Sequence, residues 1–480
     1  MVDLPIELWD SIASQTTRRY LLNLALVSAI LLNVSRRALV RKVLLDGYEK
    51  ASYEQILMFL EKHNLAGLVH DLTVRGFTID AEASTIPFGA MTNLKRINVY
   101  DCASFCAPSE TRDTLIHHIE TTFKGLRSIR MRTTCMEPLP AQFASISGLH
   151  EITWEDRRRG LLSPALFSLL NTSCNSLQEL TIWVRRDIQR SKDYFQLFSL
   201  HFPNLRSLSL GPGHHTRFVG LPPGGSVDVN KHGIRNAFSS FLTANHTLER
   251  LTLPVDSPMG PTLTYLQFAI PSPISTFLPN LVFLEAHPSL FAELARAKAP
   301  LFRTLEILSI QKTRNIYAVD AIDDMFDAFG ILAAEVGQLP LRNLRLSFNK
   351  ESPDVFQMFL KWMTISASIF PLLETMFSTT VPGENIADFP HFQHLRTISC
   401  TLGCYHVDRK DAGILVARCP SLKRLSVRTP YRVFKFSHNE VLSSTRISIY
   451  PPDDDQAEVE HGDTLQSAIE WSDEDSDDEE

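Results

Sequence analysis

The sequence has little cysteine and lacks the short motifs that identify many enzyme families. Its seven cysteines are odd in number and scattered over 480 residues, which does not indicate a disulfide framework. We therefore expect a reducing compartment and a cytoplasmic or nuclear protein. The sequence contains no glycine-rich phosphate loop, nucleophile elbow or zinc-protease helix motif. From these absences we predict that the chain is not an enzyme and needs no cofactor.

A long apolar segment of the kind that crosses a membrane is also missing. The most apolar stretch, residues 20–34, follows Arg18 and Arg19 and is the candidate for a signal or anchor segment. It has fifteen residues, whereas a helical span needs about 20, and polar side chains interrupt it. The residues before it do not form the basic start of a signal peptide. We therefore expect no membrane association.

Charge is unevenly divided along the chain. The formal net charge is −7, yet fourteen acidic residues and no lysine or arginine follow Pro451. Residues 1–450 therefore carry 47 basic and 40 acidic side chains, a net charge of +7. The acidic segment, residues 451–480, has too little apolar surface to offset its ordering entropy, so we expect it to be disordered. Two interpretations stay open: it improves solubility, or it folds back onto a basic surface and competes with a binding partner.

A repeated phrase organises the long middle region. It consists of a leucine, two residues, an apolar residue, one residue and a second apolar residue. Copies begin at Leu94, Leu126, Leu149, Leu177, Leu205, Leu248, Leu281, Leu305, Leu341, Leu395 and Leu422. The alternation within the phrase predicts a short strand, and the segments between copies have helical apolar spacing. Because one unit cannot bury its apolar face alone, we predict that the units stack into an α/β solenoid.

One copy of the repeat is more complete than the others. Residues 411–427 run as a helical pattern into Cys419-Pro420 and then into the phrase at Leu422. This copy resembles the cysteine-containing type of leucine-rich repeat. The resemblance implies parallel strands on one face of the solenoid and helices on the other. A weaker copy begins at Leu373, where the last inward position is polar.

The first 45 residues have a different pattern, with apolar residues at helical spacing. Pro5 fits the first turn of a helix whose apolar face includes Leu8 and Ile12. A second helical run begins at Tyr20 and is almost entirely apolar. Ser35 is suited to cap a third, short helix. The sequence therefore predicts a small unit of three helices, whose apolar surface exceeds what it can bury alone.

The order of residues in this unit is specific. It reads Leu4-Pro5-x-Glu7-Leu8-x-x-x-Ile12, followed by Leu21-Leu22-x-Leu24-x-Leu26-Val27-Ser28. This order resembles the F-box family, whose module docks on a Skp-type adaptor of a cullin ubiquitin ligase. The resemblance implies that seven residues contact the adaptor: Leu4, Pro5, Leu8, Ile12, Leu22, Leu24 and Val27. A helical cap that only closes the repeat domain is the alternative.

Three parts follow from these patterns. We predict an F-box-like module at residues 1–46, a leucine-rich-repeat solenoid at 47–450 and an acidic tail at 451–480. Glycine and proline clusters predict loops inserted at 211–236 and 254–276. The resemblance implies a substrate-recognition subunit of a cullin-type ubiquitin ligase. The alternative is a repeat-based scaffold for protein interactions that is unconnected to ubiquitin.

Outward positions of the predicted strands form one extended surface. Reading them gives Arg130, Arg132, Trp183, Arg345 and Arg428 among smaller polar residues, and no acidic residue. Because arginine pairs bidentately with carboxylate or phosphate, we expect these residues to bind an acidic or phosphorylated segment of a protein target. A solvated polar face without a binding hot spot is the alternative. The acidic tail argues against nucleic acid as the ligand.

One cluster contains side chains that suit zinc. Its members are His391, His394, Cys400, Cys404 and His406. Cys400, however, fills the last apolar position of a repeat phrase, where a buried thiol acts as a small apolar group. Neighbouring residues of one strand also point to opposite faces, so they do not converge on one ion. We therefore expect no metal site.

Overall fold

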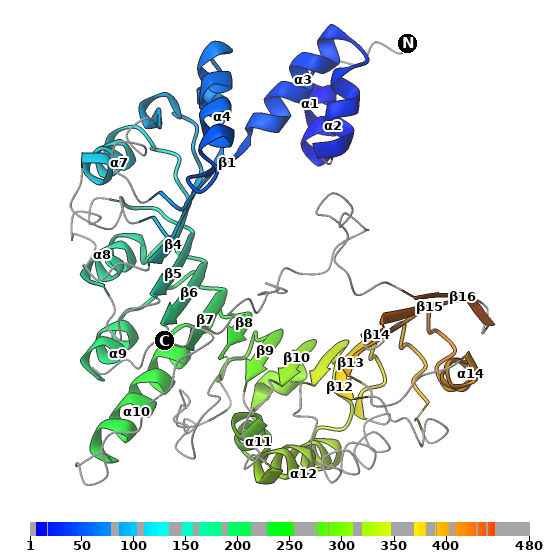
Figure 1. The fold of residues 1–480 in the computed structure, drawn as a ribbon. Helices are drawn as coiled ribbons and strands as arrows, with labels where there is room; N and C mark the ends of the chain where they lie inside the picture. Colours follow the sequence, from blue (N-terminus) through cyan, green and yellow to red (C-terminus); the bar gives the residue numbers. More distant parts are fainter. Residues whose placement is uncertain are drawn as a thin grey trace, which may run out of the picture.

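The chain folds into an arc-shaped solenoid (Figure 1). The computed structural model describes residues 6–16, 18–77, 86–102, 110–133, 146–156, 163–184, 191–212, 228–253, 274, 277–286, 288–310, 319–346, 369–380, 389, 391–402, 409–428, 431–437 and 440–446. Along the arc, strands line the inner side and helices lie on the outer side (Figure 1). This is the two-layer arrangement expected of stacked strand and helix units.

Within these ranges, sixteen strands form one sheet in the order of the chain. Strands β1 to β14 are parallel, whereas β15 and β16 are antiparallel and extend the far end of the sheet. The strands are β1 (Lys42–Asp46), β2 (Asp71–Arg75), β3 (Arg96–Tyr100), β4 (Ser128–Thr133), β5 (Glu151–Asp156), β6 (Glu179–Val184), β7 (Ser207–Pro212), β8 (Arg250–Thr252), β9 (Phe283–Ala286), β10 (Ile307–Ile310), β11 (Asn343–Leu346), β12 (Thr375–Thr380), β13 (Thr397–Leu402), β14 (Arg424–Arg428), β15 (Tyr431–Ser437) and β16 (Glu440–Arg446).

Helices separate many of these strands and cover the outer side of the sheet (Figure 1). They are α4 (Lys50–Lys62), α7 (Glu110–Thr121), α8 (Pro164–Ser173), α9 (Ser191–Phe198), α10 (Asp228–Ala244), α11 (Pro288–Arg296), α12 (Val319–Glu335) and α14 (Arg409–Arg418). Short 3-10 helices precede β2, β3 and β10: η1 (Ala66–Leu68), η2 (Phe88–Ala90) and η5 (Pro300–Arg303).

The repeat phrase builds the core between these two layers. In the phrase at Leu94, the side chains of Leu94, Ile97 and Val99 are at most 1% exposed. The same three positions are buried in each phrase from Leu126 to Leu341. Side chains at the intervening strand positions point to the opposite, inner face because strand residues alternate. The apolar phrase therefore fixes which polar residues are presented on the inner face of the arc.

Asparagine side chains tie neighbouring repeats together where the strands begin. Each stands directly before the first leucine of a phrase, and its Nδ2 donates to a backbone carbonyl of the preceding repeat. The bonds run from Asn93 to Gly67 (2.7 Å), from Asn204 to Asn175 (2.7 Å) and from Asn280 to His246 (3.1 Å). These contacts satisfy carbonyl groups at the edge of the stack and help to fix one repeat on the next.

The predicted α/β solenoid is confirmed, and each of the eleven predicted phrases carries a strand in the described part of the chain. The weaker copy at Leu373 carries β12. Two strands were not predicted, β1 and β2, because their phrases begin with Val40 and Val69 in place of leucine. The antiparallel pair β15 and β16 was not predicted either, since it follows the last phrase.

The first predicted insertion is shorter than expected. Residues 228–236, which we expected in a loop, belong to α10, and residues 211–212 complete β7. The glycine and proline signals end before α10, which then buries Phe238, Phe241 and Leu242 at helical spacing. The remaining residues of that insertion and nearly all of 254–276 lie outside the described ranges, as does the predicted tail at 451–480.

Three helices precede the sheet, as the sequence predicts. They are α1 (Ile6–Gln15), α2 (Arg18–Ala25) and α3 (Ala29–Val40). Among the described side chains, Ala13, Leu21 and Val34 form a buried hydrophobic cluster, with Trp9 and Leu39 among the partly buried side chains around it. We call this unit the N-terminal module. The helices end at Val40, so β1, which we had included in the module by placing its boundary at residue 46, belongs to the sheet.

The third helix of the module begins earlier than expected. Ser28 has extended backbone angles, φ −159° and ψ 160°, and its Oγ accepts a hydrogen bond of 3.2 Å from the backbone N–H of Leu31. Ser28 is therefore the N-cap, and it divides the apolar run from Tyr20 onward into two helices. Ser35, the predicted cap, lies buried inside α3.

Candidate functional site

Two surfaces have features that indicate binding, and the first is on the N-terminal module. Its small core leaves large apolar side chains at the surface, with exposed fractions from 43% to 87%. They are Leu8, Ile12, Tyr20, Leu22, Leu26, Val27 and Ile30, and we call them the N-terminal apolar surface. Single exposed apolar residues are common, but this many on three short helices and the turn between α2 and α3 indicate a surface that a partner covers.

The structure places five of the seven residues predicted to contact an adaptor. Leu8, Ile12, Leu22 and Val27 belong to the N-terminal apolar surface. Leu24 is partly buried and packs against the core of the module. The other two, Leu4 and Pro5, lie outside the described residues.

Three members of the surface were not among the predicted contact residues. They are Tyr20, Leu26 and Ile30, which are 62%, 87% and 60% exposed. Helical spacing predicts a shared face for Leu22 and Leu26, since they are four residues apart in the sequence. The sequence could therefore have indicated Leu26 as a contact residue. Ile30 could not be predicted in this way, because α3 begins earlier than expected.

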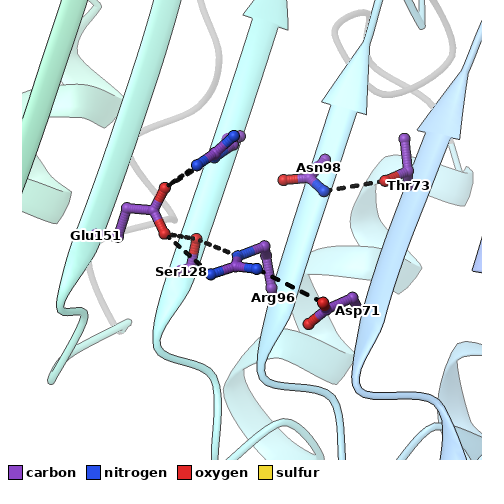
Figure 2. Close-up of polar contacts among 7 residues, drawn as sticks. Asp71, Thr73, Arg96, Asn98, Ser128 and Glu151 are labelled. Carbon is purple, nitrogen blue, oxygen red and sulfur yellow. Dashed lines mark hydrogen bonds and ion pairs between the residues drawn. The ribbon is translucent and has the colours of Figure 1, made fainter. Parts of the chain in front are cut away.

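The second surface is the inner face of the sheet, where a polar network crosses β2 to β5. Glu151 on β5 is its centre (Figure 2). One carboxylate oxygen of Glu151 accepts hydrogen bonds from Nε of Arg130 at 2.8 Å and from its Nη2 at 2.5 Å. The other accepts from Oγ of Ser128 at 2.8 Å and from Nη2 of Arg96 at 3.4 Å. Four donors thus converge on one side chain.

The network continues toward β2 (Figure 2). Nη1 of Arg96 lies 3.5 Å from Oδ2 of Asp71, so Arg96 bridges two acids on either side of it. Two residues further along β3, Nδ2 of Asn98 donates to Oγ1 of Thr73 at 3.0 Å. The buried Oδ1 of Asn98 has no donor among the described residues. The network is therefore nearly satisfied within the chain itself.

Electrostatics at Glu151 favour its ionised form. Burial alone would raise the pKa of this carboxyl, but Arg130, Ser128 and Arg96 outweigh burial and lower the pKa from its ordinary value. Burial alone would lower the pKa of Arg130, but Glu151 outweighs burial, with a smaller contribution from Tyr100, and raises the pKa of the guanidinium. Both groups are therefore charged at neutral pH, and each neutralises much of the field of the other.

A second ion pair lies beside this network. Nε of Arg132 is 2.6 Å from Oε2 of Glu155, and both side chains are at most 20% exposed. The guanidinium of Arg132 also stands over the ring of Tyr100, 5.4 Å from its centroid. Arg132 on β4 and Glu155 on β5 lie directly opposite each other in the strand register. Arg132 is thus held by one acid and one aromatic ring of the chain.

These contacts correct one expectation about the inner face. We expected its outward positions to hold no acidic residue, but Glu155 opposes Arg132 and Glu285 opposes both Thr252 and Ser309. Glu151 also points to this face. Counting every outward position in every strand, including Glu155 and Glu285, gives these acids from the sequence. The face is therefore mixed in charge.

The predicted target-binding residues are spread along this face and do not form one cluster. Arg130 and Arg132 are in the ion pairs above. Trp183 on β6 is partly exposed and lies between Glu155 and Gly211 in the register. Arg345 is exposed on β11, far along the arc. Arg428 ends β14, and its side chain lies outside the described part of the structure. Their roles in binding stay predictions.

The described cysteines and histidines show no arrangement for metal binding or thiol chemistry. Within the described ranges, no group of three or more His, Cys, Asp or Glu side chains is placed to hold a metal ion. His391 and His394 are exposed, while Cys404 and His406 fall outside those ranges. Burial raises the pKa of Cys419, the cysteine of the most complete repeat, to about 12. Its thiol therefore stays protonated at neutral pH.

No described helix combines the length and the apolar character that a membrane span requires.

Comparison with known proteins gives structural likenesses but no sequence match. No protein-family model and no curated protein matches the chain. Among solved structures, the chain is similar to a leucine-rich-repeat protein of Leptospira interrogans, at 14% sequence identity and a TM-score of 0.30. The match covers 75% of this chain and 91% of that one. The leucine-rich-repeat character of the present fold rests on its own phrase, strand order and parallel sheet.

Proposed function

We propose that this chain is a non-enzymatic receptor that holds a target protein near a ubiquitin-charged enzyme. In this proposal the N-terminal apolar surface binds a Skp-type adaptor, and through it a cullin scaffold. The inner face of the solenoid binds the target. The catalytic contribution is proximity, because two reactants held together react at a raised effective concentration.

One observation carries the adaptor part of the proposal. Among the described side chains, seven large apolar ones are exposed on this module, whereas its buried hydrophobic cluster holds Ala13, Leu21 and Val34. Exposed apolar area of this kind favours association, because covering it removes it from water. The residues also coincide with the stretch that resembles an F-box, with Leu8, Leu22 and Val27 among them.

The solenoid supports the receptor part. Its parallel strands present one continuous inner face, and repeat proteins commonly bind partners along such surfaces. The buried thiols of Cys102 and Cys419 are not suited to nucleophilic chemistry, since burial raises the pKa of each to about 12. Binding rather than bond making is the activity that these features support.

The experiment is copurification of the full chain with a purified Skp-type adaptor. The test variant carries Leu8→Ser, Leu22→Ser and Val27→Ser, at sites that are 50%, 53% and 62% exposed. Because these side chains contribute little to the core, we expect folding to be kept. Anchor residues of an interface often contribute about 2 kcal/mol each, so the variant should bind the adaptor at least about 100-fold more weakly.

A matched control removes exposed apolar side chains elsewhere. Met58→Ser and Leu372→Ser change residues that are 60% and 43% exposed, outside the N-terminal module. Adaptor binding should be unchanged in this control. Equal loss in both variants, or no binding by the intact chain, would contradict the adaptor proposal.

The alternative is a repeat scaffold in which the N-terminal module is a cap. One observation favours it: α3 packs against β1 and runs directly into this first strand of the sheet. A cap shields the edge of β1 and the first repeat from solvent. Failure of the intact, folded chain to bind any Skp-type adaptor would make this the leading account.

A further inference from the structure

A row of exposed and partly exposed polar residues runs along one edge of the sheet, where the strands begin. Each member is the second residue of a phrase and stands directly before the strand. In the first seven repeats these residues are Arg41, His70, Lys95, Arg127, His150, Gln178 and Arg206, and we call them the strand-start row. The row contains four permanent cations, two histidines and no acid.

Backbone hydrogen bonds hold the row in order. The N–H of Lys95 donates to the carbonyl of His70, and the N–H of Arg127 donates to that of Lys95, both at 2.8 Å. The same bond joins every neighbouring pair from Arg41 to Arg206, at 2.8 to 2.9 Å. Consecutive members are therefore one strand spacing apart, about 4.8 Å.

The other half of the solenoid has a different composition at the same position. From β8 to β14 the residues are Glu249, Val282, Glu306, Arg342, Glu374, Arg396 and Lys423. There, acids neutralise their neighbours: Glu374 lies 3.0 Å from Arg342 and 3.5 Å from Arg396. The concentration of positive charge is thus a property of the first seven repeats.

Two of the acids beside the strand-start row already pair with arginines of the inner face. Asp71 and Glu151 follow row members in β2 and β5, and they are bound by Arg96 and Arg130. Glu179 follows Gln178, where the row has no charge.

The row's own cations have few partners. Lys95 and Arg127 are exposed, and neither forms an ion pair with any described residue. Arg206, at the end of the row, has a loose pair with Glu249 at 3.7 Å.

The titration of His70 reflects this local field. Burial lowers the pKa of His70, and the charges of Lys95 and Arg41 lower it further, while Asp71 acts in the opposite direction. A neighbouring anion would relieve the repulsion among these groups. The row is therefore suited to an extended, strongly acidic ligand.

We propose that the strand-start row binds the acidic end of the same chain, residues 473–480. This end holds seven acidic side chains in eight residues. Fully extended, eight residues span about 26 Å, and the seven members of the row span about 29 Å. The two arrays thus carry opposite charges and have similar lengths. The inference does not depend on adaptor binding, because it uses none of the N-terminal apolar surface.

The connecting chain is long enough for this contact. Residues 447–472 follow β16 and reach about 85 Å when extended. Nine strand spacings separate β16 from β7, which corresponds to about 43 Å along the sheet. Tethering keeps the acidic end at an effective concentration of about a millimolar, so weak charge pairing suffices for frequent contact. An acidic target segment that approaches the row would have to displace it.

Zero-length cross-linking of the full chain with a carbodiimide tests the contact. The reagent joins a carboxylate to the amine of Lys95, and trypsin then releases one peptide that begins after Arg446 and holds the whole acidic end. We expect cross-links between Lys95 and residues 473–480 at about 50 mM salt, and a loss of at least about threefold at 500 mM. Absence of these cross-links at low salt would overturn the proposal.

Charge reversal separates a specific site from general attraction. Arg127→Glu with Arg206→Glu leaves Lys95 in place as reporter, and we expect the cross-link yield to fall at least threefold. The matched control, Arg342→Glu with Arg396→Glu, makes the same change in net charge at the same phrase position of the second half. Equal loss in both variants would refute the assigned site.

Mixing isotopically heavy and light chains distinguishes contact within one molecule from contact between two. Cross-links that join heavy to heavy and light to light, without mixed products, support the proposal. Mixed products in the random proportion would show that the acidic end binds a second copy, and would overturn it.

Discussion

Replacing Glu151 by glutamine tests the polar network of the inner face. The side chain keeps its shape but loses the charge that faces Arg130 and Arg96. Two guanidinium groups would then share a site without the acid that compensates them. We expect the variant to be less stable, with the loss concentrated in β3 to β5.

The size of the loss follows from the exposure of the partners. The side chains of Glu151, Arg130 and Arg96 are 13%, 36% and 41% exposed. Exposed ion pairs contribute at most about 1 kcal/mol, whereas breaking a fully buried pair costs about 3 to 5 kcal/mol. The intermediate exposure here gives a cost of about 2 kcal/mol.

Urea unfolding and hydrogen exchange of β4 and β5 measure this change. Exchange is needed because a long repeat array need not unfold in one step. Glu179→Gln is the matched control, since Glu179 opposes Glu151 on the next strand and is exposed. We expect the control to change stability by less than about 0.5 kcal/mol.

The pH dependence gives an independent check. The pKa of Glu151 is lower in the folded chain than its ordinary value, so folding favours the ionised form. The stabilisation is therefore present above the ordinary carboxyl pKa and is lost as pH falls through the lowered folded value. The difference in unfolding free energy between the intact chain and the Glu151→Gln variant should become smaller at acidic pH. If, at pH 7, Glu151→Gln lowered the unfolding free energy no more than Glu179→Gln does, the reasoning would be refuted.

Three further predictions concern other parts of the chain. Ser28→Ala removes the N-cap of α3 and should cost about 1 kcal/mol, seen as faster amide exchange near Leu31; unchanged exchange would contradict the cap. Folding disfavours protonated His70, so stability should fall as pH drops below about 6.5, and His70→Gln should reduce this slope in urea midpoints. The thiols of Cys102 and Cys419 should resist maleimide at pH 8 in the native chain, whereas labelling at the rate of the denatured chain would contradict their burial.

The alternating pattern of the repeat is why most of the strands could be predicted. A leucine followed by two inward apolar positions is a local signal, and each of the eleven phrases found in this way carries a strand. The signal failed where valine replaces leucine, at Val40 and Val69, although the rest of the phrase is unchanged. It also failed beyond the last phrase, where the chain turns back on itself in β15 and β16.

Helix boundaries in the N-terminal module depended on one hydrogen bond. Ser28 and Ser35 are both plausible caps in the sequence, and the apolar run continues past the first of them. The backbone of Ser28 is extended and its hydroxyl bonds the first turn of α3, which ends α2 before it. Apolar periodicity alone does not distinguish the two serines, because both stand within the same apolar run. The choice of cap depends on the packing of the three helices in the folded module.

The charged pairs of the inner face were predictable only in part. Aligned phrases place Glu155 opposite Arg132, so that pair follows from the sequence once all outward positions are counted. The pairing of Glu151 with Arg130 is diagonal, since Glu151 opposes Ser128 in the register. This diagonal pair forms because the long side chains of Arg130 and Glu151 reach across the space between two strands. The repeat phrase does not specify such a contact.

These pairings change where an acidic ligand meets positive charge. Arg130 and Arg132 already satisfy acids of the chain, so a phosphate or carboxylate that binds there must displace Glu151 or Glu155. Displacement leaves a largely buried acid without its partner, which lowers the net free energy gained on binding. Lys95 and Arg127 require no such exchange with a described residue. The chain's own acidic end, residues 473–480, should therefore prefer the strand-start row over the inner face, and charge reversal at Lys95 and Arg127 should weaken its binding more than reversal at Arg130 and Arg132.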